Sequence, residues 1–102
     1  MEIIGVNKDN FEEIVKNGIV LADFNADWCG PCRMLRPMLE EIASLRSDAK
    51  IVSINIDREE ELAEEYGVSS IPCLVLFKDG KEVSRSIGLK PKEEIESMLG
   101  GE

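Results

Sequence analysis

The chain has 102 residues and a formal net charge of −9 at pH 7, a length that fits one domain of modest size. Its 43% hydrophobic and 32% charged residues exclude a disordered or low-complexity segment. The acidic excess argues against nucleic-acid binding, which relies on clustered lysine and arginine. No apolar run approaches the roughly 18 residues that span a bilayer. We therefore expect a single domain over residues 1–102 that binds neither nucleic acid nor membrane.

The residue types that are missing limit the chemistry further. The sequence contains no histidine, so the commonest general base and metal ligand is missing. Residues 1–6 carry an acidic and no basic residue and only a short apolar run, unlike a signal peptide. We expect a cytoplasmic protein, monomeric because its charge keeps copies apart, that uses no metal or other cofactor.

Predicted strands and helices alternate along most of the chain. In order they are a weak strand at 2–6, a short helix after Asn10, a strand at 19–24, a helix at 31–47, a strand at 50–56, a helix at 59–66, strands at 73–78 and 81–87, and a last helix with Pro91 as its first residue. This order predicts an α/β fold in which a mixed sheet of about five strands carries about four helices on both faces.

Local signals predict how several of these elements begin and turn. Asn10 and Asp57 each precede a helical pattern and are expected as N-caps. Pro37 lies inside the long helix and is expected to kink it. Asp79-Gly80 joins the two strands predicted at 73–78 and 81–87 and predicts a tight hairpin.

The segment Trp28-Cys29-Gly30-Pro31-Cys32 stands between a buried strand and a helix. Cys29 falls at the helix N-terminus, where unpaired N–H groups and the helix dipole favour a thiolate, the nucleophilic form of the thiol. Cys32 follows one turn later, within reach of a disulfide. Gly30 leaves room for a partner chain, and Pro31 suits a first helical turn. The spacing indicates a redox pair that opens and closes without moving the fold.

Three other interpretations of the cysteine pair stay open. A structural disulfide would close a loop of only two residues, which restrains the unfolded chain very little. Half of a zinc site would need four ligands, and only Cys73 could be added. The pair could also be two core thiols, although a C-x-x-C beside a βαβ pattern is mainly a redox signal.

Asp23 interrupts an apolar strand six residues before Cys29. Burial of a carboxyl is costly unless it is protonated or hydrogen-bonded, and it raises the pKa toward neutrality. A carboxyl with such a pKa can act as an acid or base near pH 7. We expect Asp23 to lie beneath the cysteine helix and to exchange a proton with Cys32. The alternative is a side chain that faces solvent or a backbone N–H group.

These residues resemble the thioredoxin family over nearly the whole chain. The matching features, in order and spacing, are Asp23-Phe24, Ala26, Trp28 to Cys32, Pro37, Asn55-Ile56-Asp57, Tyr66-Gly67-Val68, Ile71-Pro72, Phe77, Gly80 and Gly88. The resemblance implies the thioredoxin fold and a protein-disulfide oxidoreductase that carries electrons as a dithiol. It also implies two kinds of partner, a thioredoxin reductase and disulfide-containing target proteins.

The resemblance further implies a role for each site residue. Cys29 attacks the target disulfide, and Cys32, the less exposed thiol, resolves the mixed disulfide. Asp23 accepts the proton of Cys32. Ile71-Pro72 has a cis peptide bond that keeps the sulfurs open to a partner. The docking face around Cys29 consists of Trp28, Gly30, Pro31, Val68, Ile71, Pro72 and Gly88.

Three residues near the expected site depart from the family pattern. Asn25 stands where an aromatic residue is frequent, and Ser53 stands where a lysine is frequent. Without that cation the charged form of Asp23 loses a stabilising partner, so we expect a higher pKa. Cys73 replaces the usual threonine, either as a small buried apolar residue or as a third redox thiol.

The alternatives to this function are other redox enzymes and a binding subunit. A disulfide oxidant or isomerase usually has a histidine between its cysteines, and a glutaredoxin has C-P-Y-C, so both fit less well. A binding subunit built on the same fold, or a specialised redox paralogue with a dedicated partner, remains the alternative.

Overall fold

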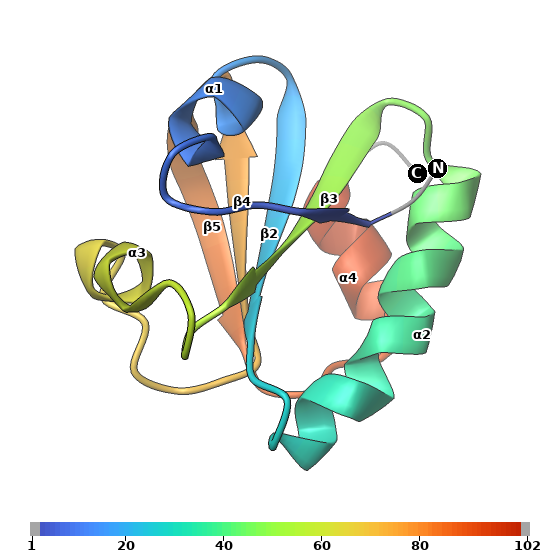
Figure 1. Cartoon of the computed structure of the whole chain (residues 1–102). Coiled ribbons are helices and arrows are strands. Elements are labelled where there is room, and N and C mark those ends of the chain that lie inside the picture. The colour runs from blue at the N-terminus through green and yellow to red at the C-terminus, as the bar shows by residue number, and fades with distance from the viewer. Residues whose placement is uncertain (1–2, 101–102) are drawn as a thin grey trace.

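The computed structural model describes residues 3–100 (Figure 1). The elements in this range are β1 (Ile4–Gly5), α1 (Phe11–Val15), β2 (Ile19–Asn25), α2 (Gly30–Leu45), β3 (Ala49–Asn55), α3 (Glu60–Glu65), β4 (Cys73–Lys78), β5 (Lys81–Ile87) and α4 (Lys92–Leu99). The predicted five strands and four helices are confirmed within these residues, with boundaries that differ by at most two residues for the long helix and its flanking strands. Residue 2, predicted as part of the first strand, lies outside the described residues.

The strands form one mixed sheet in the order β1-β3-β2-β4-β5. The first three of these are parallel to one another, and β4 runs antiparallel to both β2 and β5. In Figure 1, α1 and α3 cover one face of the sheet and α2 and α4 cover the other. The central strand β2 is therefore buried on both sides, which explains its nearly continuous apolar run.

Alternate residues of β2 face opposite sides of the sheet. Val20, Ala22 and Phe24 belong to the core beneath α1 and α3, where the rings of Phe11 and Phe77 meet with centroids 5.6 Å apart. Leu21 belongs to the second core, beneath α2 and α4. Residues 23 and 25 continue the row of Leu21, and this register turns the two polar side chains of β2 toward α2.

Asn10 stands at the N-cap position of α1 as predicted, and Asp57 does not stand at that of α3. Neither side chain makes a capping hydrogen bond, because other groups engage both of them. The Oδ1 atom of Asn10 accepts a hydrogen bond from the N–H of Asn7 at 2.8 Å, and the N-terminus of α1 has no side-chain cap. The carboxylate of Asp57 accepts a hydrogen bond from the indole of Trp28. The N-cap position of α3 is occupied instead by Glu59, whose side chain makes no capping bond.

The hairpin between β4 and β5 forms as predicted. Asp79 and Gly80 have φ values of 50° and 87°, and two positive values in succession are typical of a type I′ turn. Asp79 also joins the hairpin to Gly18 through two hydrogen bonds of 2.8 and 2.9 Å. Pro91 is the N-cap of α4, with an extended ψ of 153°, and not its first residue as predicted. Pro37 lies inside α2, and the kink there stays a prediction.

Candidate active site

The cysteine pair lies at the start of α2, just beyond the carboxyl end of the central strand. Cys29 is the N-cap of α2, and its Sγ atom accepts a hydrogen bond of 3.2 Å from the N–H of Cys32. The two residues form a disulfide, with Cα atoms 5.2 Å apart. The sulfur of Cys29 therefore occupies the position where an N–H donor and the positive end of the helix dipole stabilise a thiolate.

Both sulfur-bearing residues are largely covered in this disulfide form. Cys29 and Cys32 each expose 5% of their surface, so the expectation that Cys32 is the less exposed of the two is wrong for this state. They form a small apolar cluster with Ala26, and Ile56 and Ile71 pack against it. Ile56 was noted in the sequence only as part of a shared motif, and its place beside the pair was not anticipated.

The predicted docking residues lie at the N-terminus of α2 and in loops around it. Trp28 is 66% exposed, Pro31 is exposed, and a Cβ atom at Gly30 would meet no atom within 4 Å. Pro72 is buried and follows a cis peptide bond, and its carbonyl accepts a 2.8 Å hydrogen bond from the N–H of Gly88.

The remaining two docking residues differ in their contacts. Ile71 packs both on the cysteine cluster and on the core beneath α1 and α3. Val68 packs on that core alone among the described residues. The structure therefore brings Ile71 to the sulfurs, and it gives Val68 no packing contact with them.

Asp23 is buried beside the cysteine helix, with 2% of its surface exposed. Loss of hydration raises the pKa of this carboxyl to about 6, against the lowering effects of the Asn25 hydrogen bond and the Arg36 charge. Within residues 3–100 its Oδ1 atom has no hydrogen-bond partner. Asp23 and Cys32 line the same cavity, of about 340 Å³. The predicted inward orientation and raised pKa of Asp23 are thus present in the structure.

Two groups near Asp23 stand in for the missing lysine. The amide nitrogen of Asn25 donates to Asp23 Oδ2 at 3.2 Å and to Ser53 Oγ at 2.8 Å. Ser53 is the β3 residue paired with Asp23 in the parallel register. Arg36, one turn beyond Cys32 on α2, lines the same cavity. The sequence marked Asn25 and Ser53 only as departures and did not mark Arg36, although its i+4 spacing from Cys32 was a usable signal.

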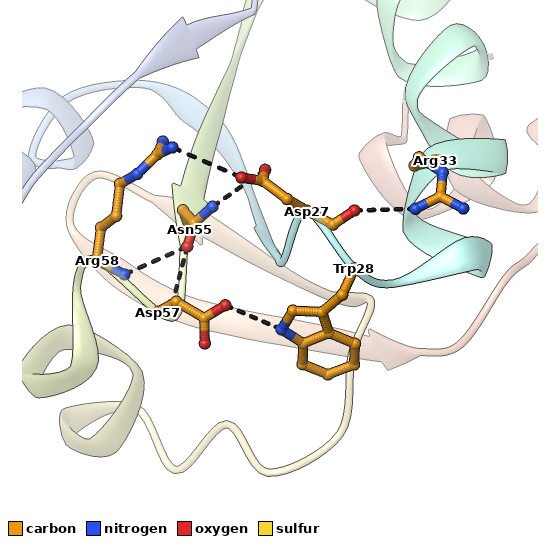
Figure 2. A network of polar contacts seen from close by, with 6 residues as sticks. All are labelled: Asp27, Trp28, Arg33, Asn55, Asp57 and Arg58. Carbon is orange, nitrogen blue, oxygen red and sulfur yellow. Dashed lines mark hydrogen bonds and ion pairs between the residues drawn. The ribbon is translucent and has the colours of Figure 1, made fainter.

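A polar network fixes the loop that carries Trp28 (Figure 2). The indole Nε1 donates to Asp57 Oδ2 at 2.9 Å, and the N–H of Asp57 donates to Asn55 Oδ1 at 2.9 Å. Asn55 also donates to Asp27 at 3.3 Å, which forms an ion pair with Arg58 at 3.5 Å. The exposed indole is therefore hydrogen-bonded to the segment that follows β3.

The third cysteine is separated from the surface. Cys73, the first residue of β4, is 1% exposed within the core beneath α1 and α3, and burial raises the pKa of its thiol. This environment suits a small apolar residue, while a redox role for Cys73 stays a hypothesis.

Residues 3–100 contain neither a cluster of metal-ligating side chains nor a membrane-spanning helix. No group of three or more histidine, cysteine, aspartate or glutamate side chains there could hold a metal ion. Nor is any helix in that range both long and apolar enough to cross a membrane.

Comparisons with known proteins agree with the fold and the cysteine pair. The family model described as Thioredoxin matches residues 2–100. Thioredoxin from Chlamydia muridarum is 50% identical over 94 residues, 92% of each chain. Thioredoxin from Bacillus subtilis is 45% identical over 100 residues, 97% of this chain and 96% of that one. The solved structure of a mutant thioredoxin from Halobacterium salinarum NRC-1 is 39% identical, with a TM-score of 0.90 over 96% of this chain and 88% of that one.

The fold and the disulfide pair at a helix N-terminus define a dithiol–disulfide exchange protein, that is, a protein-disulfide oxidoreductase. The chain belongs to the thioredoxin family.

Proposed function

We propose that this protein reduces the disulfides of other proteins with Cys29 as the attacking thiol, Cys32 as the resolving thiol and Asp23 as the proton acceptor. The observation that carries the assignment is the N-cap position of Cys29, whose sulfur accepts the N–H of Cys32. A thiolate at Cys29 is stabilised by that donor and by the helix dipole.

The exchange proceeds in two steps. In the first, the Cys29 thiolate attacks one sulfur of the target disulfide, whose S–S bond breaks, and the second target sulfur leaves as a thiolate that takes up a proton. In the second, Cys32 loses its proton and its sulfur attacks the Sγ atom of Cys29. The Cys29–Cys32 bond forms, the bond between Cys29 and the target breaks, and the remaining target sulfur leaves as a thiolate that takes up a proton. The target has then gained two electrons and two protons, and the protein is oxidised.

The environment of Asp23 supports its role as the acceptor in the second step. It shares a cavity with Cys32, and the pKa of about 6 leaves most of the carboxyl ionised at pH 7 while keeping its proton affinity high. The unpartnered Oδ1 atom is free to take a proton.

The apolar rim around the sulfurs supports a docking face for target chains. We assign to it Trp28, Gly30, Pro31, Val68, Ile71, Pro72 and Gly88. The exposed indole and the open space at Gly30 are the strongest support, because an extended target chain must approach the sulfurs closely.

The cellular setting is part of the same proposal. We infer that the protein acts as a monomer in the cytoplasm and that a thioredoxin reductase returns it to the dithiol form. The free thiol of Cys73 is in keeping with a reducing compartment.

The assignment is tested with insulin as target and dithiothreitol as electron donor. We expect Cys29→Ser and Cys32→Ser to abolish catalysed insulin reduction, and Cys73→Ala to retain it. Under non-reducing conditions Cys32→Ser should trap insulin in a mixed disulfide through Cys29, while Cys29→Ser should trap none. Trapping through Cys32 in the Cys29→Ser variant would reverse the two roles.

A redox titration of the Cys29–Cys32 couple separates a reductant from an oxidant. We expect the couple to be reducing relative to glutathione. If instead a Cys29→Ser/Cys32→Ser double variant fully restores function to cells lacking the protein, it acts as a binding subunit and the redox proposal fails.

A further inference from the structure

Asn25 makes polar contacts with both strands of the central pair β2 and β3. Its amide nitrogen lies 2.9 Å from the backbone oxygen of Asp23 and 3.2 Å from the Oδ2 atom of the same residue. It also lies 2.8 Å from the Oγ atom of Ser53. An amide nitrogen carries two hydrogens, so it can donate to Ser53 and to Asp23 at the same time.

The contacts of Asn25 follow from strand geometry. Residues two apart on a strand share a face, which places Asn25 beside Asp23 on the side of α2. The register of the parallel pair sets Ser53 directly opposite Asp23. The amide is thus held at three points on two strands, and it cannot turn away from the carboxylate without losing the bond to Ser53.

The two oxygens of Asp23 consequently differ. Oδ2 accepts the amide hydrogen bond, whereas Oδ1 is buried without a partner in the described part of the chain. An unpartnered buried oxygen costs free energy, and a catalytic role is one explanation for its presence in a folded protein. Because Asp23 and Cys32 line one cavity, Oδ1 is the oxygen left to receive a proton from that side.

We propose that Asn25, anchored by Ser53, is a positioning residue for proton transfer: it holds Oδ2 of Asp23 and leaves Oδ1 as the accepting atom for Cys32. The inference rests on the proposed function and assigns a part of it to a residue outside the reacting groups. The proton moves from the sulfur of Cys32 to Asp23, and no other bond changes in that transfer.

Other titratable and charged groups also face Asp23. From α2 these are Cys32, Arg33 and the guanidinium of Arg36, and from the loop after β2 it is Asp27, all of which line the cavity with Asp23. The thiol of Cys73 lies on the opposite face of the sheet, in the core beneath α1 and α3. The charge of Arg36 acts in the same direction as the Asn25 amide and favours the ionised carboxylate. Asn25 is distinct among these groups because it makes a direct hydrogen bond to the carboxylate.

The first test is an NMR titration of the Asp23 carboxyl carbon in the reduced protein, assigned with Asp23→Asn. Asn25→Leu keeps the shape of the side chain and removes its donor. We expect it to raise the midpoint by about one pH unit, the size set by one hydrogen bond to a carboxylate. Ser53→Ala should give a smaller rise. Ser44→Ala, which removes an exposed hydroxyl hydrogen bond on α2, should give none.

The second test is the rate at which Cys32 releases reduced insulin from the mixed disulfide, measured against pH. With a midpoint raised from about 6 to about 7, the ionised fraction falls about fivefold at pH 6, about twofold at pH 7 and hardly at all above pH 8. In an Asp23→Asn background, Asn25→Leu should leave the pH profile unchanged. An equal slowing at every pH, or an effect that persists without Asp23, would mean that Asn25 acts only on structure.

The outcomes separate this inference from the proposed function. An unchanged carboxyl midpoint in folded Asn25→Leu overturns the positioning role, even if insulin is reduced normally. If Asn25→Leu does not fold, as judged by circular dichroism, an unchanged midpoint in Ser53→Ala overturns it. If the unaltered protein fails to reduce insulin, the proposed function fails, and the NMR titration still decides whether Asn25 controls Asp23.

Discussion

Replacement of Asp23 by asparagine should stabilise the protein, and the gain should depend on pH. The carboxyl is 2% exposed, and burial raises its pKa from 3.8 to about 6. Asparagine has the same shape and no charge, and its side-chain oxygen can still accept the Asn25 hydrogen bond. The substitution therefore removes the cost of an ionised group in the core and little else.

The size of the effect follows from proton linkage. A rise of about two pKa units corresponds to about 3 kcal/mol at 1.36 kcal/mol per unit. Because the folded-state pKa is the higher one, the favourable contribution of the carboxyl is fully present below pH 4 and is lost as the pH rises through about 6. We expect Asp23→Asn to raise the free energy of unfolding by up to about 3 kcal/mol at pH 7.5 and to change it little near pH 4.

Urea unfolding of the disulfide form, followed by circular dichroism from pH 4 to pH 8, measures this difference directly. Asp9→Asn, at an exposed position, is the matched control because it makes the same change in net charge. A gain from Asp23→Asn that is equal at pH 4 and pH 7.5 would refute the linkage argument, since it would then arise from packing. The absence of any gain at pH 7.5 would show that the carboxyl is not desolvated.

Three further predictions concern the rim, the third thiol and the core. Gly30→Ala should leave stability unchanged or raise it by less than about 1 kcal/mol, because a Cβ there meets no atom within 4 Å. It should slow reduction of insulin more than reduction of a small aromatic disulfide, and equal slowing of both would rule out a docking role. Mild oxidation should yield a Cys29–Cys32 peptide by mass spectrometry and none linked to Cys73, which is 1% exposed; a Cys73-linked peptide would support a third redox thiol. Phe77→Ala should lower the free energy of unfolding by about 3–5 kcal/mol, since its ring is buried against Phe11 and Tyr66, and a loss below about 1 kcal/mol in urea would mean that this core collapses around the cavity.

Local patterns predicted the strands better than the helix caps. The β4–β5 hairpin was predicted to the residue, because its turn has the residue types that a two-residue connection needs and it stands between two strand-like segments. Asn10 does occupy the N-cap position of α1 and Asp57 does not occupy that of α3, and neither side chain makes a capping bond, for a tertiary or loop-specific reason. Their side chains have the correct chemistry for capping, but Asn7 and Trp28 supply donors that the pattern of the helix itself does not reveal.

The active site shows the same limit. The cysteines and Asp23 could be found from spacing and from the rarity of a carboxyl in an apolar strand. The contacts of Asn25 could not, because they depend on the register that sets Ser53 opposite Asp23. The absence of the family lysine predicted that the charged form of Asp23 has one stabilising partner fewer. In the structure, the amide of Asn25 from the same strand and the guanidinium of Arg36 from α2 both favour that charged form.

The disulfide closes within the first turn of α2 and joins residues only three apart. Reduction of the disulfide separates two sulfurs that remain on the same helical turn. We therefore expect reduction and oxidation to leave the shape of the surrounding surface almost unchanged. An enzyme that recharges the protein and a substrate that discharges it therefore meet nearly the same surface. A partner must therefore distinguish the dithiol form from the disulfide form by the sulfur atoms themselves. The dithiol form presents a thiolate that can attack, and the disulfide form can only be attacked by a thiolate of the partner.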